Sequence, residues 1–170
     1  MEFLEKDLEQ IIFDNLQTID GCELLAERFL EIAYLPFVKR QFRIGNYGIA
    51  DIITAGKITE MYQKRNDPNF YVRSNLEINI YELKKHEINI DTLIQSMRYY
   101  KGIRRYLQIR DFSNYEVNII LIGSKICIND WVYLTKPFTH LFVYTYDYDI
   151  NGIIFKPQDL RNYKLIKEGF

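Results

Sequence analysis

The spacing of apolar residues changes twice along the chain, from helical to alternating and back. Positions such as Leu4, Leu8 and Ile12 recur at helical intervals, whereas Val38, Arg40 and Phe42 alternate along an extended segment. Helices are predicted over 3–16, over 21–33, and from Asn89 or Asp91 to about 109. Strands are predicted over 37–44, 49–55, 76–84, 116–123, 141–147 and 152–155.

The segments between these elements read as turns or insertions. Residues 45–48 (GNYG) form a turn, and the polar stretch 60–75 reads as either a loop or an inserted hairpin. A helix that follows the third strand and leads to a fourth indicates a crossover connection. The sequence therefore predicts an α/β protein, with a mixed sheet flanked by helices in the order α-β-β-β-α-β plus extra C-terminal strands.

Length and composition fit a single domain over 1–170 with a buried core. Hydrophobic residues make up 48% and charged residues 26% of the chain. The isolated Cys22 and Cys127 match neither a zinc site nor a disulfide framework, which fits a reducing cytoplasm. The acidic N-terminus does not resemble a secretory signal, and no apolar run approaches the ~20 residues of a membrane span. A cytoplasmic location is therefore expected.

The net charge of −1 hides a strong asymmetry along the chain. Residues 1–31 hold nine acids and two bases, whereas residues 98–110 hold five bases and no acid. The overall balance is not that of a protein that packages nucleic acid. The uneven distribution nevertheless provides acids that could hold a metal ion and bases that could contact phosphates.

The tripeptide Glu82-Leu83-Lys84 ends the third predicted strand, and Asp51 interrupts the otherwise apolar second strand. Residues 82 and 84 share one face of a strand, whereas Leu83 points into the core. Two neighbouring carboxylates are the oxygen ligands that Mg²⁺ or Mn²⁺ requires, and the backbone carbonyl of Leu83 can add a further ligand. Lys84 would then lie beside the same ion, able to orient or deprotonate a water molecule or to steady a phosphate.

Each of these residues also has a structural interpretation. Glu82 and Lys84 alone could form a solvated pair on an edge strand. Asp51 could sit near a bulge or pair with an arginine, although a carboxylate inside an apolar strand is costly without a partner. The three together, in this order of elements, favour a phosphodiester-cleaving site.

This pattern resembles the PD-(D/E)xK nuclease superfamily over about residues 3–123, with strands from 124–170 added. The resemblance implies a restriction-endonuclease-like core, with Asp51 as the first acid and Glu82 and Lys84 as the second half of the motif. Ala50 stands where many members have proline. Members often place a helical glutamate against the metal; Glu5 is the candidate here, with Glu9 as its neighbour at helical spacing.

The third predicted helix adds a resemblance to the branch that contains RecB nuclease domains and mismatch nucleases. In that branch a glutamine and often a tyrosine face the site, and Gln95 and Tyr99 stand at matching positions. The nucleic-acid contacts are expected from Tyr99, from the basic Lys85, and from a stripe formed by Arg98, Lys101 and Arg105. A polar stripe beside the core and a solvated helix face are the alternatives.

The sequence thus favours a Mg²⁺- or Mn²⁺-dependent nuclease, endo- or exo-acting, with DNA as the favoured partner. Asp51, Glu82, Lys84 and Gln95 are the candidate catalytic residues, and the metal ligands would be Asp51, Glu82, Leu83 and Glu5. Two alternatives remain at this stage. One is a non-catalytic nucleic-acid-binding module on the same fold, and the other is an interaction protein whose tyrosine-rich C-terminal strands form a dimer surface. Cutting both strands of a duplex would suit a homodimer, and no membrane association is expected.

Overall fold

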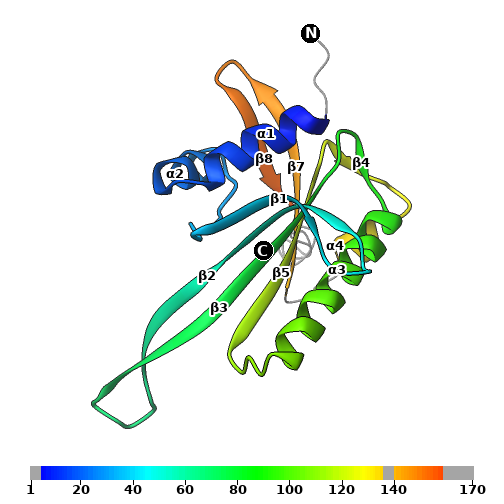
Figure 1. Ribbon diagram of the computed structural model, residues 1–170. Coiled ribbons are helices and arrows are strands. Elements are labelled where there is room, and N and C mark those ends of the chain that lie inside the picture. The colour runs from blue at the N-terminus through cyan, green and yellow to red at the C-terminus, as the bar shows by residue number, and fades with distance from the viewer. Residues whose placement is uncertain (1–4, 136–139, 159–170) are drawn as a thin grey trace.

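The computed structural model describes residues 5–135 and 140–158, which form a mixed sheet covered by helices on both faces (Figure 1). The helices are α1 (Glu5–Leu16), α2 (Ile19–Glu27), α3 (Ile90–Ile109) and α4 (Trp131–Thr135). The strands are β1 (Phe37–Arg43), β2 (Ile49–Gln63), β3 (Phe70–Leu83), β4 (Glu87–Ile88), β5 (Tyr115–Gly123), β6 (Lys125–Ile126), β7 (Leu141–Asp149) and β8 (Gly152–Pro157).

The main sheet has six strands in the order β1-β2-β3-β5-β7-β8. Strands β1, β2 and β3 are antiparallel neighbours, and β7 and β8 form an antiparallel hairpin. Strands β3, β5 and β7 run parallel, with α3 crossing from β3 to β5. The predicted crossover and the mixed sheet are therefore confirmed. Strands β4 and β6, a two-residue parallel pair, were not predicted.

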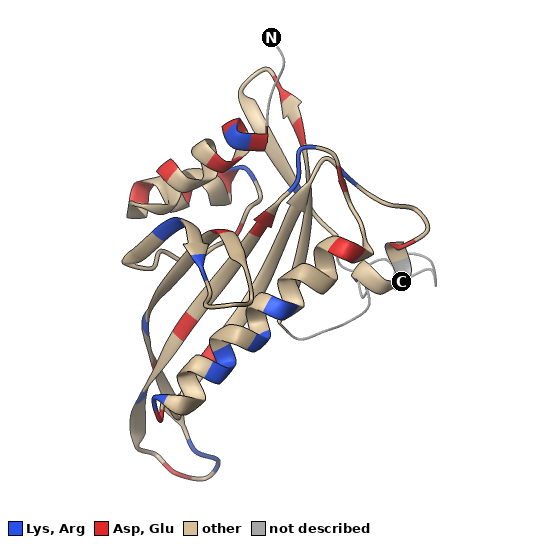
Figure 2. Ribbon diagram, turned by 45° about the vertical axis from the view of Figure 1, so that its right-hand side comes forward, with Lys and Arg blue, Asp and Glu red and all other residues tan. Residues whose placement is uncertain are grey.

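The two faces of the sheet carry separate cores because side chains alternate along each strand. On one face α1 and α2 pack against residues such as Ile52, Leu83 and Ile120. On the other face α3 packs against Ile53, Ile80 and their neighbours. Figure 2 shows the charge asymmetry of the sequence on this frame, with acids gathered on α1 and α2 and bases along α3. No helix among the described residues is long and apolar enough to cross a membrane.

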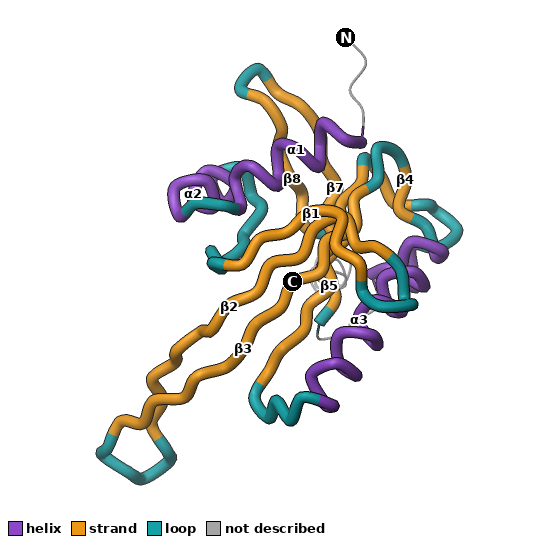
Figure 3. The backbone as a smooth tube through the Cα atoms, in the orientation of Figure 1, coloured by secondary structure: helices purple, strands orange, loops and turns teal. Residues whose placement is uncertain are grey.

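Strands β2 and β3 extend far beyond the rest of the sheet as a two-stranded ribbon (Figure 3). Their pairing runs from Ile52–Tyr81 to Gln63–Phe70. The hairpin alternative for 60–75 is thus confirmed. Both strands are longer than predicted because the outer ribbon is solvated on both faces, so that it lacks the burial pattern from which a strand is recognised.

The ends of α2 and α3 test the predicted helix boundaries. Asn89 caps α3 and forms a capping box with Thr92, which selects Asn89 over Asp91 as the predicted cap. The predicted helix over 21–33 is wrong at both ends. Helix α2 begins after Thr18, whose side chain accepts a hydrogen bond from Gly21 N, and it ends at Glu27. Phe29 has a φ of 69°, a left-handed conformation that an α-helix cannot contain.

Gly102 allows α3 to approach the β1–β2 turn closely. A Cβ atom at this position would lie 2.7 Å from Cδ2 of Tyr47 and 2.8 Å from Cγ2 of Ile44. We expect Gly102→Ala to lower the free energy of unfolding by about 1–2 kcal/mol, because overpacking costs more than the gain in helix propensity. Urea unfolding measures this, with the exposed Lys101→Ala as a control that stays within about 0.5 kcal/mol of wild type. Unchanged stability of Gly102→Ala would show that the turn does not pack against α3.

Candidate active site

Asp51 and Glu82 lie on neighbouring antiparallel strands at the point where the pairing of β2 with β3 ends. The last pair of the ladder is Ile52–Tyr81, and the two acids follow it on the face that carries α3. Beyond this pair the backbone N–H of Leu83 is bonded to a side chain of β2: it donates a hydrogen bond of 2.7 Å to Oδ2 of Asp51. This bond fixes the first carboxylate against the strand that carries the second.

Lys84 lies on the same side as Glu82, as the two-residue spacing predicts. Its Nζ donates a hydrogen bond of 3.0 Å to Oε1 of Glu82. The intervening Leu83 is fully buried on the opposite face, among residues of α1 and α2. The prediction that strand alternation separates Leu83 from its two neighbours is confirmed.

The two carboxylates share an environment that disfavours their ionised forms. Burial, followed by the nearby charge of Asp51, raises the pKa of Glu82 to about 7. Burial also raises the pKa of Asp51 to about 6, against the opposing effects of the Leu83 hydrogen bond and the Lys84 charge. Oε2 of Glu82 is buried and accepts no hydrogen bond within the described residues. When both carboxylates are ionised, the pair carries two negative charges against the one ammonium of Lys84.

The acids of α1 lie near Asp51 and Glu82 but do not join them as a third metal ligand. Oε2 of Glu5 accepts a hydrogen bond of 3.1 Å from the backbone N–H of Lys85, and its charge contributes to the raised pKa values of Asp51 and Glu82. Glu9 is held elsewhere, by Arg40 Nε and Gln41 Nε2, each at 2.9 Å. Within residues 5–135 and 140–158, no three acids, histidines or cysteines are grouped as metal ligands. The structure thus brings together two of the three predicted carboxylates and places Glu5 near them.

Gln95 and Tyr99 lie one turn apart on α3, and Tyr99 is close enough to the carboxylates to be influenced by their charge. Nε2 of Gln95 donates a 2.5 Å hydrogen bond to the hydroxyl of Tyr99. Burial and the charge of Glu82 raise the pKa of Tyr99, which indicates that its hydroxyl lies close to the acids. Its ring is 1% exposed and packs against Gly48, where a Cβ would meet Cε1 at 2.7 Å. Tyr99 therefore offers its hydroxyl and leaves no open ring face for a base to stack on.

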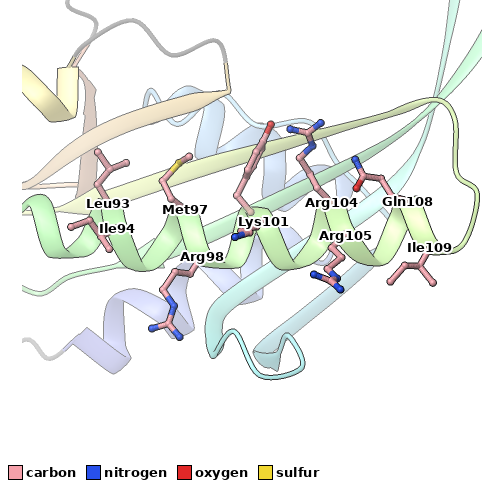
Figure 4. Close-up of a pocket in the computed structure, with 10 residues that line it drawn as sticks. Leu93, Ile94, Met97, Arg98, Lys101, Arg104, Arg105, Gln108 and Ile109 are labelled. Carbon is pink, nitrogen blue, oxygen red and sulfur yellow. The ribbon is translucent and has the colours of Figure 1, made fainter.

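The predicted basic stripe is exposed along α3. Figure 4 shows Arg98 and Arg105 projecting from the same side of the helix, with Lys101 between them and Arg104 on the opposite side. Arg98, Lys101 and Arg105 are all exposed. Lys85 follows directly after β3 and is less exposed; its carbonyl accepts a 2.6 Å hydrogen bond from the Tyr146 hydroxyl.

The end of β1 and the β1–β2 turn contribute residues that the sequence did not predict. Arg43 and Asn46 line a cavity of about 590 Å³ together with Gln95, Arg98 and Tyr99 of α3. Arg43 ends β1 and Asn46 lies in the turn that follows it, so both come shortly before the strand that bears Asp51; this place in the chain is the signal that could have found them. Their approach to α3 depends on the close packing at Gly102, which spacing alone does not reveal.

Comparison with known proteins supplies no relative that bears on this arrangement. The chain matches no protein-family model, no curated protein and no solved structure.

Proposed function

We propose that this protein is a metal-dependent phosphodiesterase of nucleic acids, a nuclease of the PD-(D/E)xK type. The observation that carries the proposal is the pair of carboxylates, Asp51 and Glu82: burial raises both pKa values, and the buried Oε2 of Glu82 has no hydrogen-bond partner in the described part of the chain, which together call for a cation. Burying a carboxylate oxygen without a hydrogen-bond or charge partner costs free energy. Carboxylate oxygens are ligands that suit Mg²⁺ or Mn²⁺. The donors present therefore fit the ion that the resemblance implies.

Each residue has a defined task in this proposal. Asp51 and Glu82 hold the ion, with Glu5 as a further acid within electrostatic reach. When bound, Mg²⁺ supplies positive charge to the phosphate and favours deprotonation of an attacking water. The Gln95–Tyr99 hydrogen bond presents a polar edge toward the same space and can orient the phosphate or the water.

Lys84 acts best as a fixed positive charge. Burial lowers its pKa, but the negative charge of Glu82 and its hydrogen bond, together with Glu5 and Asp51, outweigh burial, so the pKa is raised overall. The side chain is therefore an ammonium at neutral pH and is poorly suited to accept a proton from water. An ammonium beside the phosphate stabilises the negative charge that develops during cleavage.

Metal-dependent cleavage by the purified protein is the direct test. Supercoiled plasmid, linear duplex, single-stranded DNA and RNA would be incubated with Mg²⁺, with Mn²⁺ or with EDTA. Cutting that requires the metal supports the proposal. Failure to cut any substrate with either metal, while nucleic acid is still bound, would replace it with a non-catalytic binding module.

Lys84→Gln should slow cleavage by roughly 100-fold while nucleic-acid binding changes little, because the lost charge acts mainly on the transition state. Single-turnover rates at saturating protein measure the chemical step. Lys39→Gln, an exposed lysine on β1, is the matched control and should cleave like wild type. A wild-type rate for Lys84→Gln would remove Lys84 from the reaction.

A further inference from the structure

Two adjoining hollows lie between the β1–β2 turn and α3, and Tyr99, which lies within the electrostatic influence of Glu82, lines the first of them. The first is the polar cavity of about 590 Å³ lined by Arg43, Asn46, Gln95 and Arg98. The second is an apolar groove of about 640 Å³ between the C-terminal half of α3 and strands β1 to β3. Arg43 and Tyr47 line both, so the two hollows adjoin each other.

The polar cavity has the features of a phosphate site. Arg43 from β1 and Arg98 from α3 both line it and are both exposed. Among the described residues, neither guanidinium has an ion-pair or hydrogen-bond partner, so their charges are available to an anion. Asp91 is the acid that lines the same cavity, which leaves an excess of positive charge. The Gln95–Tyr99 pair separates this cavity from Asp51 and Glu82, as expected for a neighbour of the scissile phosphate.

The apolar groove has the features of a base-binding site. Buried core residues such as Ile53 and Ile78 line it. Three aromatic side chains line it as well: Phe42, Tyr106 and Phe112. Tyr106 and Phe112 are 55% and 45% exposed as whole residues. No acid lines the groove in the described part of the chain, and Arg105 lies at its edge with Arg43. The Arg110 guanidinium lies over one face of the Tyr106 ring, 5.4 Å from its centroid, which leaves the other face of that ring and the Phe112 ring for a base. Aromatic rings beside arginines that have no ion-pair partner among the described residues match the two parts of a nucleotide, the base and its phosphate.

We propose that these two hollows bind an unpaired nucleotide, the base in the apolar groove and its phosphate between Arg43 and Arg98. The inference rests on the proposed nuclease function and gives it a substrate class, single-stranded nucleic acid or a single-stranded end. A base inside a duplex is stacked and paired, so its face cannot reach a groove in the protein. The arginines that line the groove and the adjoining cavity favour this occupant over an apolar peptide.

Binding can be measured apart from cleavage with Asp51→Asn protein and fluorescent oligonucleotides of one sequence. The oligonucleotides would be single-stranded DNA, single-stranded RNA, duplex DNA, and single-stranded DNA with abasic sites. We expect at least one intact single strand to bind roughly 10-fold more tightly than the duplex and the abasic strand. Phe112→Leu and Tyr106→Leu should each weaken the intact strand by about 5- to 20-fold and leave the abasic strand unchanged.

Arg43→Gln and Arg98→Gln should weaken the intact and the abasic strands alike, because both carry the phosphate. The matched controls lie at the distant end of the β2–β3 ribbon and should bind like wild type: Phe70→Leu, an exposed aromatic, and Arg65→Gln, an exposed arginine. Equal affinity for duplex and single strands, with no effect of Phe112→Leu or Tyr106→Leu, would overturn the inference.

The two proposals fail in different ways. Metal-dependent cleavage by wild-type protein without any preference for single strands overturns the base-binding groove and leaves the nuclease. Absence of cleavage, with single-strand binding that depends on Tyr106 and Phe112, overturns the nuclease and leaves a binding site. Loss of folding in any variant is detected by circular dichroism, and the exposed positions of both aromatic rings make the conservative leucine changes tolerable.

Discussion

Asp51→Asn is expected to abolish metal-dependent cleavage, by roughly 1,000-fold or more, which corresponds to about 4 kcal/mol of transition-state stabilisation. The substitution keeps an oxygen that can accept the hydrogen bond from Leu83 N–H, so the strand geometry is retained. It removes one of the two negative charges that would hold the cation. Single-turnover cleavage and calorimetric titration with Mn²⁺ would show both losses together.

Glu82→Gln should behave in the same way, since its carboxylate lies beside that of Asp51 and is more deeply buried. The matched control is Glu23→Gln, an exposed acid on α2, which should leave both cleavage and Mn²⁺ affinity unchanged. If Asp51→Asn cleaved at the wild-type rate, the carboxylate pair would not be the catalytic centre. Loss of cleavage with an unchanged affinity for Mn²⁺ would instead place the ion elsewhere in the molecule.

The metal-free protein should lose stability as the pH rises from about 5 to 8. The folded state raises the pKa of Asp51 from 3.8 to about 6 and that of Glu82 from 4.5 to about 7. In this window the folded protein retains protons that the unfolded chain has released, so the free energy of unfolding falls as pH increases. The pair should contribute a loss of roughly 4 kcal/mol, or roughly 10 °C in Tm for a chain of this size.

Thermal unfolding at several pH values, with EDTA or with Mg²⁺, measures this dependence. Mg²⁺ should raise Tm at pH 8 and have little effect at pH 5, where the carboxylates bind protons instead. Asp51→Asn should flatten the pH dependence in EDTA and be more stable than wild type at pH 8. Burial also raises the pKa of Glu77, so the difference between wild type and Asp51→Asn isolates the contribution of the pair. A wild-type Tm that rises steadily from pH 5 to 8 would contradict the prediction.

The sequence predicted the parts of the fold in which one face of an element is buried. Helix α3 follows this rule, and alternation correctly placed Glu82 and Lys84 on one face with Leu83 on the other. Strand β1 does not follow it: none of its residues is fully buried, and Gln41, which has no partner in the β1–β2 register and a φ of 49°, breaks the predicted alternation, so that Val38 and Phe42 pack against different cores. Elements that bury little were harder to recognise. The outer ribbon of β2 and β3 is exposed on both sides, and the short pair of β4 and β6 is too brief to show any period.

The site was predictable only as far as strand geometry determines it. Asp51 and Glu82 meet because their strands are neighbours, which the order of elements implies. The carboxylate of Glu5 instead accepts a backbone hydrogen bond from Lys85, a side-chain direction that helical spacing does not specify. Arg43 reaches the site region through the packing of a turn against Gly102, which depends on distances between segments remote in sequence.

The β2–β3 hairpin is long enough to hold its turn far from its base. Its base carries both carboxylates, whereas its turn at residues 64–69 lies roughly 40 Å away along the strands. Extra residues inserted in that turn would lengthen a solvated connection without shifting the register that pairs Ile52 with Tyr81. A second binding domain could therefore be inserted in this turn. The geometry of Asp51 and Glu82 at the base of the hairpin would stay intact.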